Sequence, residues 1–145
     1  MDGIYDILNS DQNCLLKGGV HSPYTGKCYT FSSNKLGWDD ARAECHKNGG
    51  DLATIANQAT LDFIVSNFKI SEYSYFGGYQ SKKGVWSWAD GSPWTGFGNW
   101  ATGDGKEPSV NGDAYTVIKV DTWYYNTERS KNYFYLCQYW IHPTL

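Results

Sequence analysis

The sequence contains no run of apolar residues long enough to cross a bilayer, which takes about 18 to 20 residues. Its beginning, MDGIYDILNS, has neither the basic nor the apolar segment of a secretory signal, so we expect a removed signal or a longer parent chain. Basic residues are not in excess either: 12 Lys and Arg stand against 15 Asp and Glu, a net charge of −3. This composition argues against membrane insertion and against a nucleic-acid binder, which normally gathers a basic excess on one face.

Catalytic motifs are also missing. The chain has no Gly-x-Ser-x-Gly, no His-Glu-x-x-His and no phosphate-binding loop. Its three histidines, His21, His46 and His142, are scattered and have no acid at motif spacing. We therefore predict that the protein is not an enzyme. No Asn-x-Ser/Thr sequon occurs, so N-glycosylation is not expected.

The four cysteines form no Cys-x-x-Cys pair, which argues against a zinc ribbon or a thioredoxin motif. An even number fits two disulfides and an oxidising, extracellular compartment, either as a secreted protein or as an ectodomain. Four cysteines allow three pairings. Nesting by distance suggests a local bridge, Cys14–Cys28, and a long bridge, Cys45–Cys137.

Local patterns predict an α+β fold with an antiparallel sheet, because the helices fall in the first half of the chain and the strands mainly in the second. Two amphipathic helices are expected: one carries Trp38, Ala41 and Cys45 on its apolar stripe, and the other spans residues 57–68 with Asn57 as its N-cap. Strands are expected at residues 26–31, 51–55, 73–79, 84–92, 114–120 and 132–140.

Residues 89–114 are rich in Gly and Pro and have no periodicity. Such long loops are uncommon in compact domains and usually carry function. We expect a lead-in at residues 1–13, one domain at 14–140 and a tail at 141–145. The chain also has seven Trp and twelve Tyr. Most should lie in the core, and a surplus on the surface would suit a recognition module.

The ordered motifs resemble the C-type lectin-like domain family from about Cys14 to Tyr139. They are WDDARAEC (38–45), GGDLATI (49–55), FGGY (76–79), WSWADGSPW (86–94), NW (99–100) and YLCQY (135–139). The resemblance implies the long form of the fold, with Cys14–Cys28 as the N-terminal bridge. Ala114 stands where the family has the first Cys of its inner disulfide, and no Cys follows Asn126. The resemblance therefore implies a long loop without its usual cross-link.

In sugar-binding members of this family, the long loop holds Ca²⁺ with a Glu-Pro-Asn or Gln-Pro-Asp motif and a Trp-Asn-Asp motif on the next strand. Here the first motif reads Glu107-Pro108-Ser109, and the second reads Trp123-Tyr124-Tyr125 before Asn126. The resemblance implies a cis Pro108. Asn126 would reach the site only if its strand bulged. Ca²⁺ prefers 6 to 8 oxygen ligands, so we expect calcium binding to be weak or absent.

Three functions are weighed on this basis. The first is a carbohydrate-binding module with a degenerate calcium site, in which the four candidate metal ligands converge on the ligand face. The second is a sugar site without calcium or with only weak help from it, using Ser109, Asn111 and the ring of Trp123, Tyr124 or Tyr125. Side chains alternate along a strand, so only one of the two tyrosines can face outward. The third is a calcium-independent protein-recognition or structural module.

A glycan or glycoprotein ligand and a homodimer are the expected partners. The candidate metal ligands are Glu107, Ser109, Asp113 and Asn126, and the candidate sugar contacts are these four with Asn111 and Tyr124.

Overall fold

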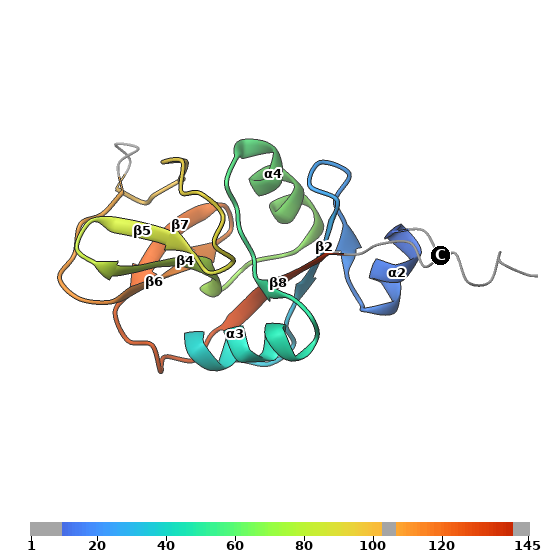
Figure 1. Ribbon diagram of the computed structural model, residues 1–145, viewed down its shortest axis with the longest axis horizontal. Coiled ribbons are helices and arrows are strands. Elements are labelled where there is room, and N and C mark those ends of the chain that lie inside the picture. Colours follow the sequence, from blue (N-terminus) through green and yellow to red (C-terminus); the bar gives the residue numbers. More distant parts are fainter. Residues whose placement is uncertain (1–9, 103–106, 141–145) are drawn as a thin grey trace, which may run out of the picture.

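The computed structural model describes residues 10–102 and 107–140. Within these residues, eight strands form one mixed sheet, and three helices pack around it (Figure 1). The helices are α2 (Ser10–Leu16), α3 (Trp38–Lys47) and α4 (Gln58–Asn67). The strands are β1 (Val20–His21), β2 (Lys27–Phe31), β3 (Asp51–Leu52), β4 (Ser74–Lys82), β5 (Val85–Trp88), β6 (Ala114–Lys119), β7 (Thr122–Asn126) and β8 (Phe134–Trp140).

The sheet joins the two ends of the chain. Its strand order is β1-β2-β8-β4-β6-β7, with β3 paired to β8 and β5 paired to β4. All pairs are antiparallel except β4 with β8, which run parallel. The last strand, β8, therefore lies in the middle of the sheet, between β2 and β4. The predicted α+β class with an antiparallel sheet is confirmed.

The first predicted helix forms as α3, and its apolar stripe points into the core. Trp38, Ala41 and Cys45 are buried, as their spacing on one helix face requires. Trp38 also donates its indole N–H to the Phe76 carbonyl at 3.1 Å. Gly49 has a positive φ of 88° after the helix end, a backbone conformation that glycine adopts without strain.

The second predicted helix forms as α4, and its predicted cap is confirmed. The Asn57 side chain accepts a hydrogen bond from the Thr60 backbone N–H at 2.9 Å. Leu61 and Ile64 are buried beneath the helix. Figure 1 shows α4 and α3 on opposite sides of β8.

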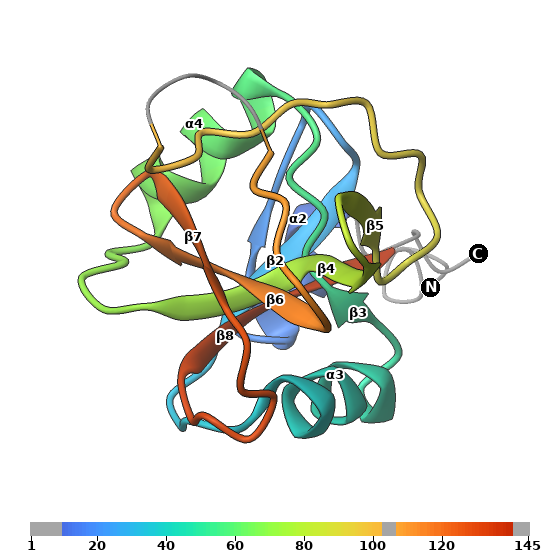
Figure 2. The ribbon, with the colours of Figure 1, turned by 90° about the vertical axis from the view of Figure 1, so that its left-hand side faces the viewer.

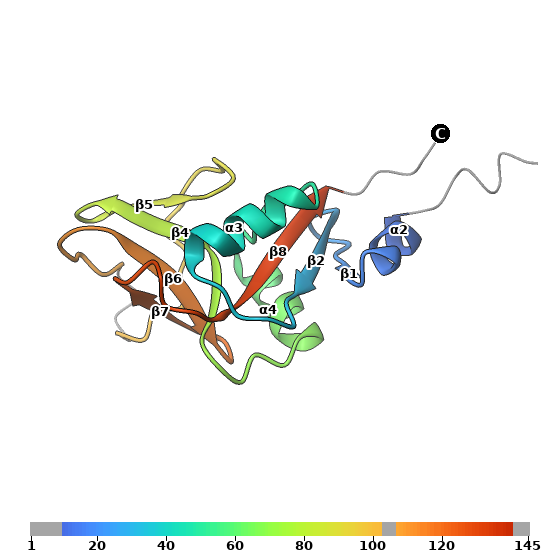
Figure 3. The same cartoon turned by 90° about the horizontal axis from the view of Figure 1, so that it is seen from below.

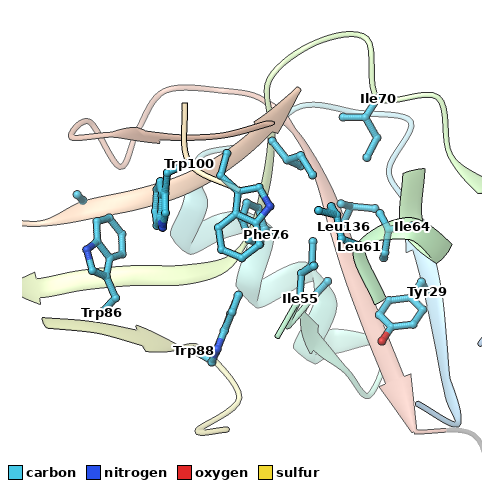
Figure 4. Close-up of a cluster of buried hydrophobic side chains, with 14 residues drawn as sticks. Tyr29, Ile55, Leu61, Ile64, Ile70, Phe76, Trp86, Trp88, Trp100 and Leu136 are labelled. Carbon is cyan, nitrogen blue, oxygen red and sulfur yellow. The ribbon is translucent and has the colours of Figure 1, made fainter. Parts of the chain in front are cut away.

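The two helices cover two separate hydrophobic clusters. One cluster includes Trp38, Ala41 and Cys45 of α3 together with side chains of β8 and β6. The other holds Leu61 and Ile64 of α4 together with aromatic side chains from β4, β5 and β7 (Figure 4). Many of the tryptophans fall in this second cluster, so the α4 side of the sheet is also the side on which the long loop is built.

Both predicted disulfides are confirmed. Cys14–Cys28 closes the N-terminal segment, and Cys45–Cys137 joins α3 to β8 across a sequence separation of 92 residues. All four cysteines are buried. Packing is tight beside the long bridge: a Cβ added to Gly50 would stand 2.1 Å from the Gln138 carbonyl oxygen, so no larger residue fits there.

The N-terminal region differs from the sequence-based expectation. Helix α2 begins at Ser10, inside the segment predicted as a lead-in, and β1 adds a short strand that the pattern did not indicate. The remaining lead-in, the predicted tail at 141–145 with His142, and residues 103–106 of the loop lie outside the described residues. Within the described part, no helix is long and apolar enough to cross a membrane.

Asp90, at the start of the long loop, anchors that loop to the sheet. Its carboxylate accepts hydrogen bonds from the Ser92 backbone N–H at 2.9 Å and from Gln138 Nε2 at 2.8 Å. Lys27 Nζ lies 3.9 Å away. Burial alone would raise the pKa of Asp90, but the hydrogen bonds from Ser92 and Gln138 outweigh burial and hold that pKa below its ordinary value.

The variant Asp90→Asn should therefore lose stability at neutral pH, by about 1 kcal/mol for the charge-assisted hydrogen bonds. Because the folded-state pKa is depressed, this contribution is present above the unfolded-state pKa near 3.9 and is lost as pH falls through the folded-state pKa. Urea unfolding of both proteins at pH 7 and below pH 4 measures it. A gap between the two proteins that widens in acid would contradict this assignment.

Candidate functional site

The long loop is attached to the sheet as though it were an extra strand beside β7. The Trp123 backbone N–H donates to the Asn99 carbonyl at 2.8 Å, and the Ala101 N–H donates to the Trp123 carbonyl at 2.9 Å. Trp100 and Trp123 form an isolated parallel bridge. Figure 2 shows the loop arching from β5 toward β7 before it returns to β6. The loop is thus held against a rigid strand in its middle.

A cluster of tryptophans lies under this loop. Ring centroids are 4.6 Å apart for Trp88 and Trp94, 5.0 Å for Trp86 and Trp100, and 5.5 Å for Trp100 and Trp123. Trp123 is fully buried. Figure 4 shows Trp86 beside Trp100, and the ring centroids of Trp88 and Phe76 are 6.0 Å apart. Large rigid rings give the loop a solid base, although the loop has no regular structure of its own.

Two of these indoles hold the Glu-Pro-Ser segment. Trp94 Nε1 donates to Glu107 Oε1 at 2.8 Å, and Trp86 Nε1 donates to the Pro108 carbonyl at 2.8 Å. No cis peptide bond occurs among the described residues, so the expectation of a cis Pro108 is wrong for this structure. Most X–Pro bonds in folded proteins are trans. In the trans segment, the Glu107 carboxylate is turned toward Trp94.

A buried glutamine holds the rest of the segment. Gln80 of β4 donates from Nε2 to the carbonyls of Val110 and Gly112, both at 2.8 Å, and accepts the Gly84 N–H at 2.7 Å. Its side chain is therefore fully used, as a buried amide requires. Ser109 and Asn111 are exposed on this segment. Their side chains face solvent beside the turn between β4 and β5.

Asp113 belongs to a different cluster. Its Oδ2 lies 3.2 Å from Nη2 of Arg129, which also pairs with Asp39 at 3.2 Å and donates to the Tyr115 hydroxyl at 3.0 Å from Nε. Tyr115 is buried on the α3 side of the sheet. Asp113 is thus half of an ion pair on the opposite face of β6 from the tryptophan cluster.

Asn126 lies on that same α3 side. The β6–β7 register runs from Lys119↔Thr122 to Tyr115↔Asn126 without a shift, so the bulge that would bring Asn126 into a calcium site is absent. Its Nδ2 donates to the Tyr75 hydroxyl at 3.0 Å, and its Oδ1 accepts the Glu128 N–H at 3.2 Å. Burial raises the pKa of Tyr75 to about 12, so this hydroxyl stays protonated.

The expected convergence of Glu107, Asp113 and Asn126 is therefore not what the structure shows. Because side chains alternate along a strand, Trp123 and Tyr125 lie on the tryptophan-cluster side of β7, whereas Tyr124 and Asn126 lie on the α3 side. Among residues 10–102 and 107–140, no group of three or more His, Cys, Asp or Glu side chains is placed to hold a metal ion. Glu107, Asp113 and Asn126, three of the four predicted ligands, therefore do not fit a single Ca²⁺ in this arrangement.

Of the two tyrosines, Tyr125 is the one whose ring is exposed on the side of the sheet that carries the long loop. Tyr125 is 43% exposed. Tyr124 is half-buried and packs edge-to-face against Tyr73, with ring centroids 5.1 Å apart. Tyr125 borders a shallow, mainly apolar pocket of about 110 Å³. The pocket is lined by Trp100, Ala101, Thr102, Pro108, Trp123, Tyr124 and Tyr125.

The side chains that shape this site were only partly foreseen. Sequence motifs located Glu107 and the loop, but they did not identify Trp86, Trp94 and Gln80 as the groups that hold it. The available signal was the group of three tryptophans, Trp86, Trp88 and Trp94, in the segment WSWADGSPW. It does not say which oxygen an indole N–H will bind, because that depends on how the loop folds back.

The comparisons agree with this architecture. The family model described as "Lectin C-type domain" matches residues 34–139. The chain is 33% identical over 104 residues to C-type lectin domain family 17, member A of Homo sapiens, covering 70% of this chain and 26% of that protein. It is 34% identical over 92 residues to the galactose-specific lectin nattectin of Thalassophryne nattereri, covering 60% and 56%. It is 37% identical over 71 residues to killer cell lectin-like receptor subfamily F member 1 of Macaca fascicularis, covering 48% and 31%.

The chain thus spans less than two thirds of the length of each of these relatives. Among solved structures, it superposes on a calcium-independent type II antifreeze protein with a TM-score of 0.68 and 22% identity, covering 81% of this chain and 88% of that chain. It superposes on the murine dendritic cell inhibitory receptor 2 domain with a TM-score of 0.65 and 24% identity, covering 81% and 93%. At these identities the likeness concerns the fold alone.

Proposed function

The chain belongs to the C-type lectin domain family, and from that premise we propose that it is a recognition domain that binds a carbohydrate without a bridging calcium ion. The ligand site that we propose is the pocket beside Tyr125 together with the Glu107–Ser109 segment. The observation that carries the proposal is the hydrogen bond from Trp94 Nε1 to Glu107 Oε1 at 2.8 Å. An indole N–H thus binds one of the two oxygens of the carboxylate that a metal ion would need.

Calcium independence follows from how each remaining oxygen is used. Asp113 is paired with the permanent positive charge of Arg129, and that charge repels a divalent cation. Asn126 uses both ends of its amide on Tyr75 and Glu128. The loop segment is held by Trp86, Trp94 and Gln80 instead. In our proposal these hydrogen bonds replace both the ion and the missing inner disulfide.

Carbohydrate binding is supported by the chemistry of the exposed groups. A tyrosine ring offers a flat apolar surface for the C–H face of a pyranose, while hydroxyl and carboxylate groups bind its hydroxyls. Tyr125 supplies the ring, and Ser109 and Glu107 are the polar groups on the adjoining segment. The galactose-specific relative supports the same class of ligand.

Two disulfides support an extracellular location. Neither the homodimer nor a catalytic role follows from these contacts, and the homodimer stays a prediction.

The variant Tyr125→Ala should weaken binding of the best glycan on an array by about tenfold, since stacking of a ring on one aromatic side chain contributes about 1 to 2 kcal/mol. Binding of the parent protein to a glycan array is measured in the presence of a calcium chelator. The affinity for the glycan that binds best is then measured by calorimetry for the parent and the variant. Tyr24→Ala is the matched control, because Tyr24 is 70% exposed and lies in the turn between β1 and β2. Equal affinities for the parent protein and Tyr125→Ala would place the ligand elsewhere.

Protein recognition is the second candidate, and one surface favours it. Tyr73 packs edge-to-face on both Tyr124 and Tyr133, at 5.1 and 5.9 Å, and Lys119 lies 5.6 Å from its ring centre. Rigid tyrosines of this kind are typical hot-spot residues at protein interfaces. If the array shows no glycan binding at all, the carbohydrate proposal fails. Pull-down of a protein ligand by the parent but not by Tyr73→Ala would then support this candidate.

A further inference from the structure

A groove between α2, α3 and β8 lies at the end of the molecule away from the long loop (Figure 1). In Figure 3, β8 runs between α3 and β2, and α2 lies beyond β2. The groove has a volume of about 530 Å³, within the range of small-molecule sites. Its walls are mainly polar. They are formed by Leu16, Lys17, Thr30, Phe31, Ser32, Ser33, Asn34, Glu44, Asn48, Tyr135, Cys137 and Tyr139.

Most polar groups of this groove already have close partners. The Tyr135 hydroxyl donates to Asn34 Oδ1 at 2.9 Å, and the Ser32 hydroxyl donates to the Asn34 carbonyl at 2.7 Å. Glu44 is the exception. Its half-buried carboxylate accepts a hydrogen bond from Asn48 Nδ2 at the limiting distance of 3.5 Å, and among the described residues it has no other hydrogen-bond donor and no ion pair.

The Glu44 side chain lines the groove together with two aromatic side chains, Tyr135 and Tyr139. Burial raises the pKa of the Tyr135 hydroxyl, and the negative charge of Glu44 raises that pKa further. Burial likewise raises the pKa of Tyr139, and Glu44 adds to this effect against a hydrogen bond to Thr30. Both rings belong to β8 and are buried in the wall. A carboxylate next to tyrosine rings is a setting that favours an organic cation.

An ammonium group already lies in part of this setting. Lys17 Nζ is 4.9 Å from the centre of the Tyr139 ring and donates to the Asn48 carbonyl at 3.1 Å. It does not reach Glu44 within ion-pair distance. Lys17 itself is exposed at the rim, so its flexible side chain is free to swing away. In this groove the Lys17 ammonium thus lies over the Tyr139 ring, and the Glu44 carboxylate can pair with a second ammonium group.

We propose that this groove is a second ligand site, which takes a small molecule or side chain with a primary ammonium group that pairs with Glu44. The two sources of such a group are an amino sugar and a lysine side chain. The site is independent of the proposed carbohydrate site, because none of its lining residues belongs to the long loop or to β7.

Titration of the ¹⁵N-labelled protein, followed by NMR chemical shifts, tests the proposal with four probes. Glucosamine and Nα-acetyl-lysine amide carry the ammonium, and N-acetylglucosamine and Nα,Nε-diacetyl-lysine amide are their neutral counterparts. We expect saturable shifts in α3 and β8 with at least one cationic probe, and at least tenfold weaker binding of its neutral counterpart. The cationic probe that binds more tightly identifies the source. If neither cationic probe shifts these residues, or the neutral counterpart binds as tightly, the proposal is overturned.

Variants locate the binding group. Glu44→Gln should weaken binding of the cationic probe at least tenfold, whereas Glu72→Gln, an exposed carboxylate paired with Lys35, should leave it unchanged. Lys17→Gln should bind about as tightly as the parent or more tightly, since the competing ammonium is gone. This second variant keeps the test decisive if Glu44→Gln does not fold. Loss of binding in Lys17→Gln, or parental affinity in a folded Glu44→Gln, would overturn the assignment. Glu107→Ala should not change these shifts, which separates this site from the proposed carbohydrate site.

Discussion

Replacing both cysteines of the long bridge, Cys45→Ala with Cys137→Ala, should lower the free energy of unfolding by about 4 to 5 kcal/mol. The chain-entropy model gives this magnitude for a bridge that closes a loop of some 90 residues. The bridge spans a sequence separation of 92 and ties α3 to β8, the strand that joins the two halves of the sheet. Such a loss is a large part of the total stability of a small domain. Urea unfolding at 25 °C measures it.

The short bridge is the matched comparison. Cys14–Cys28 has a sequence separation of 14, for which the same model gives about 3 kcal/mol. It also connects only α2 with β2, at the end of the molecule away from the long loop (Figure 1). We expect the variant without this bridge to unfold at a higher urea concentration than the variant without the long bridge. The reverse order would show that loop length does not decide stability here.

The variant Trp94→Phe should weaken glycan binding by about 30-fold, the largest effect on affinity that we expect from one conservative change. Phenylalanine keeps an aromatic ring beside Trp88 but cannot donate a hydrogen bond to Glu107. The released Glu107 segment would then be ordered only when ligand binds, and that ordering reduces affinity. Because Glu107 is only half-buried, the stability loss should be modest, about 1 kcal/mol. Calorimetry with the best array glycan gives the affinity, and thermal unfolding gives the stability.

Glu107→Gln and Trp94→Phe together separate the two explanations of this site. An amide oxygen still accepts the Trp94 N–H, so in our account Glu107→Gln keeps the loop in place and binds glycan within about threefold of the parent. If Glu107 instead held a calcium ion that bridges protein and sugar, a glutamine oxygen would also coordinate the ion, Trp94→Phe would matter little, and both variants would lose binding in chelator. The effect of Trp94→Phe, measured in calcium and in chelator, therefore decides between a hydrogen-bonded loop and a metal-bound loop.

Elements whose formation depends on local chemistry were predictable from the sequence. The α4 cap at Asn57, the buried face of α3 and the stop at Gly49 each follow from a few neighbouring residues. The disulfide pairing followed from nesting and from the family resemblance. Helix α2 and strand β1 were missed because they are short and lie beside the Cys14–Cys28 bridge, which stabilises segments that have weak patterns of their own.

The ligand site was harder to predict, because its geometry depends on contacts between distant segments. The sequence shows Glu107 and the two tyrosines after Trp123, but it does not show that Trp94 takes the carboxylate. It also does not fix the β6–β7 register, and that register puts Asn126 on the α3 side and Tyr125 on the loop side. A shift of one residue would have exchanged those faces. The cis Pro108 came from the family alone.

The central claim is that the Glu107 segment is held by protein hydrogen bonds, so ligand binding does not need calcium. Its most direct test is calorimetric titration of the parent protein with its best array glycan, once in saturating calcium and once in excess chelator. We expect the two dissociation constants to agree within about twofold, because no step of recognition involves the ion. A loss of affinity of tenfold or more in chelator would contradict this account, since it would show that an ion completes the site.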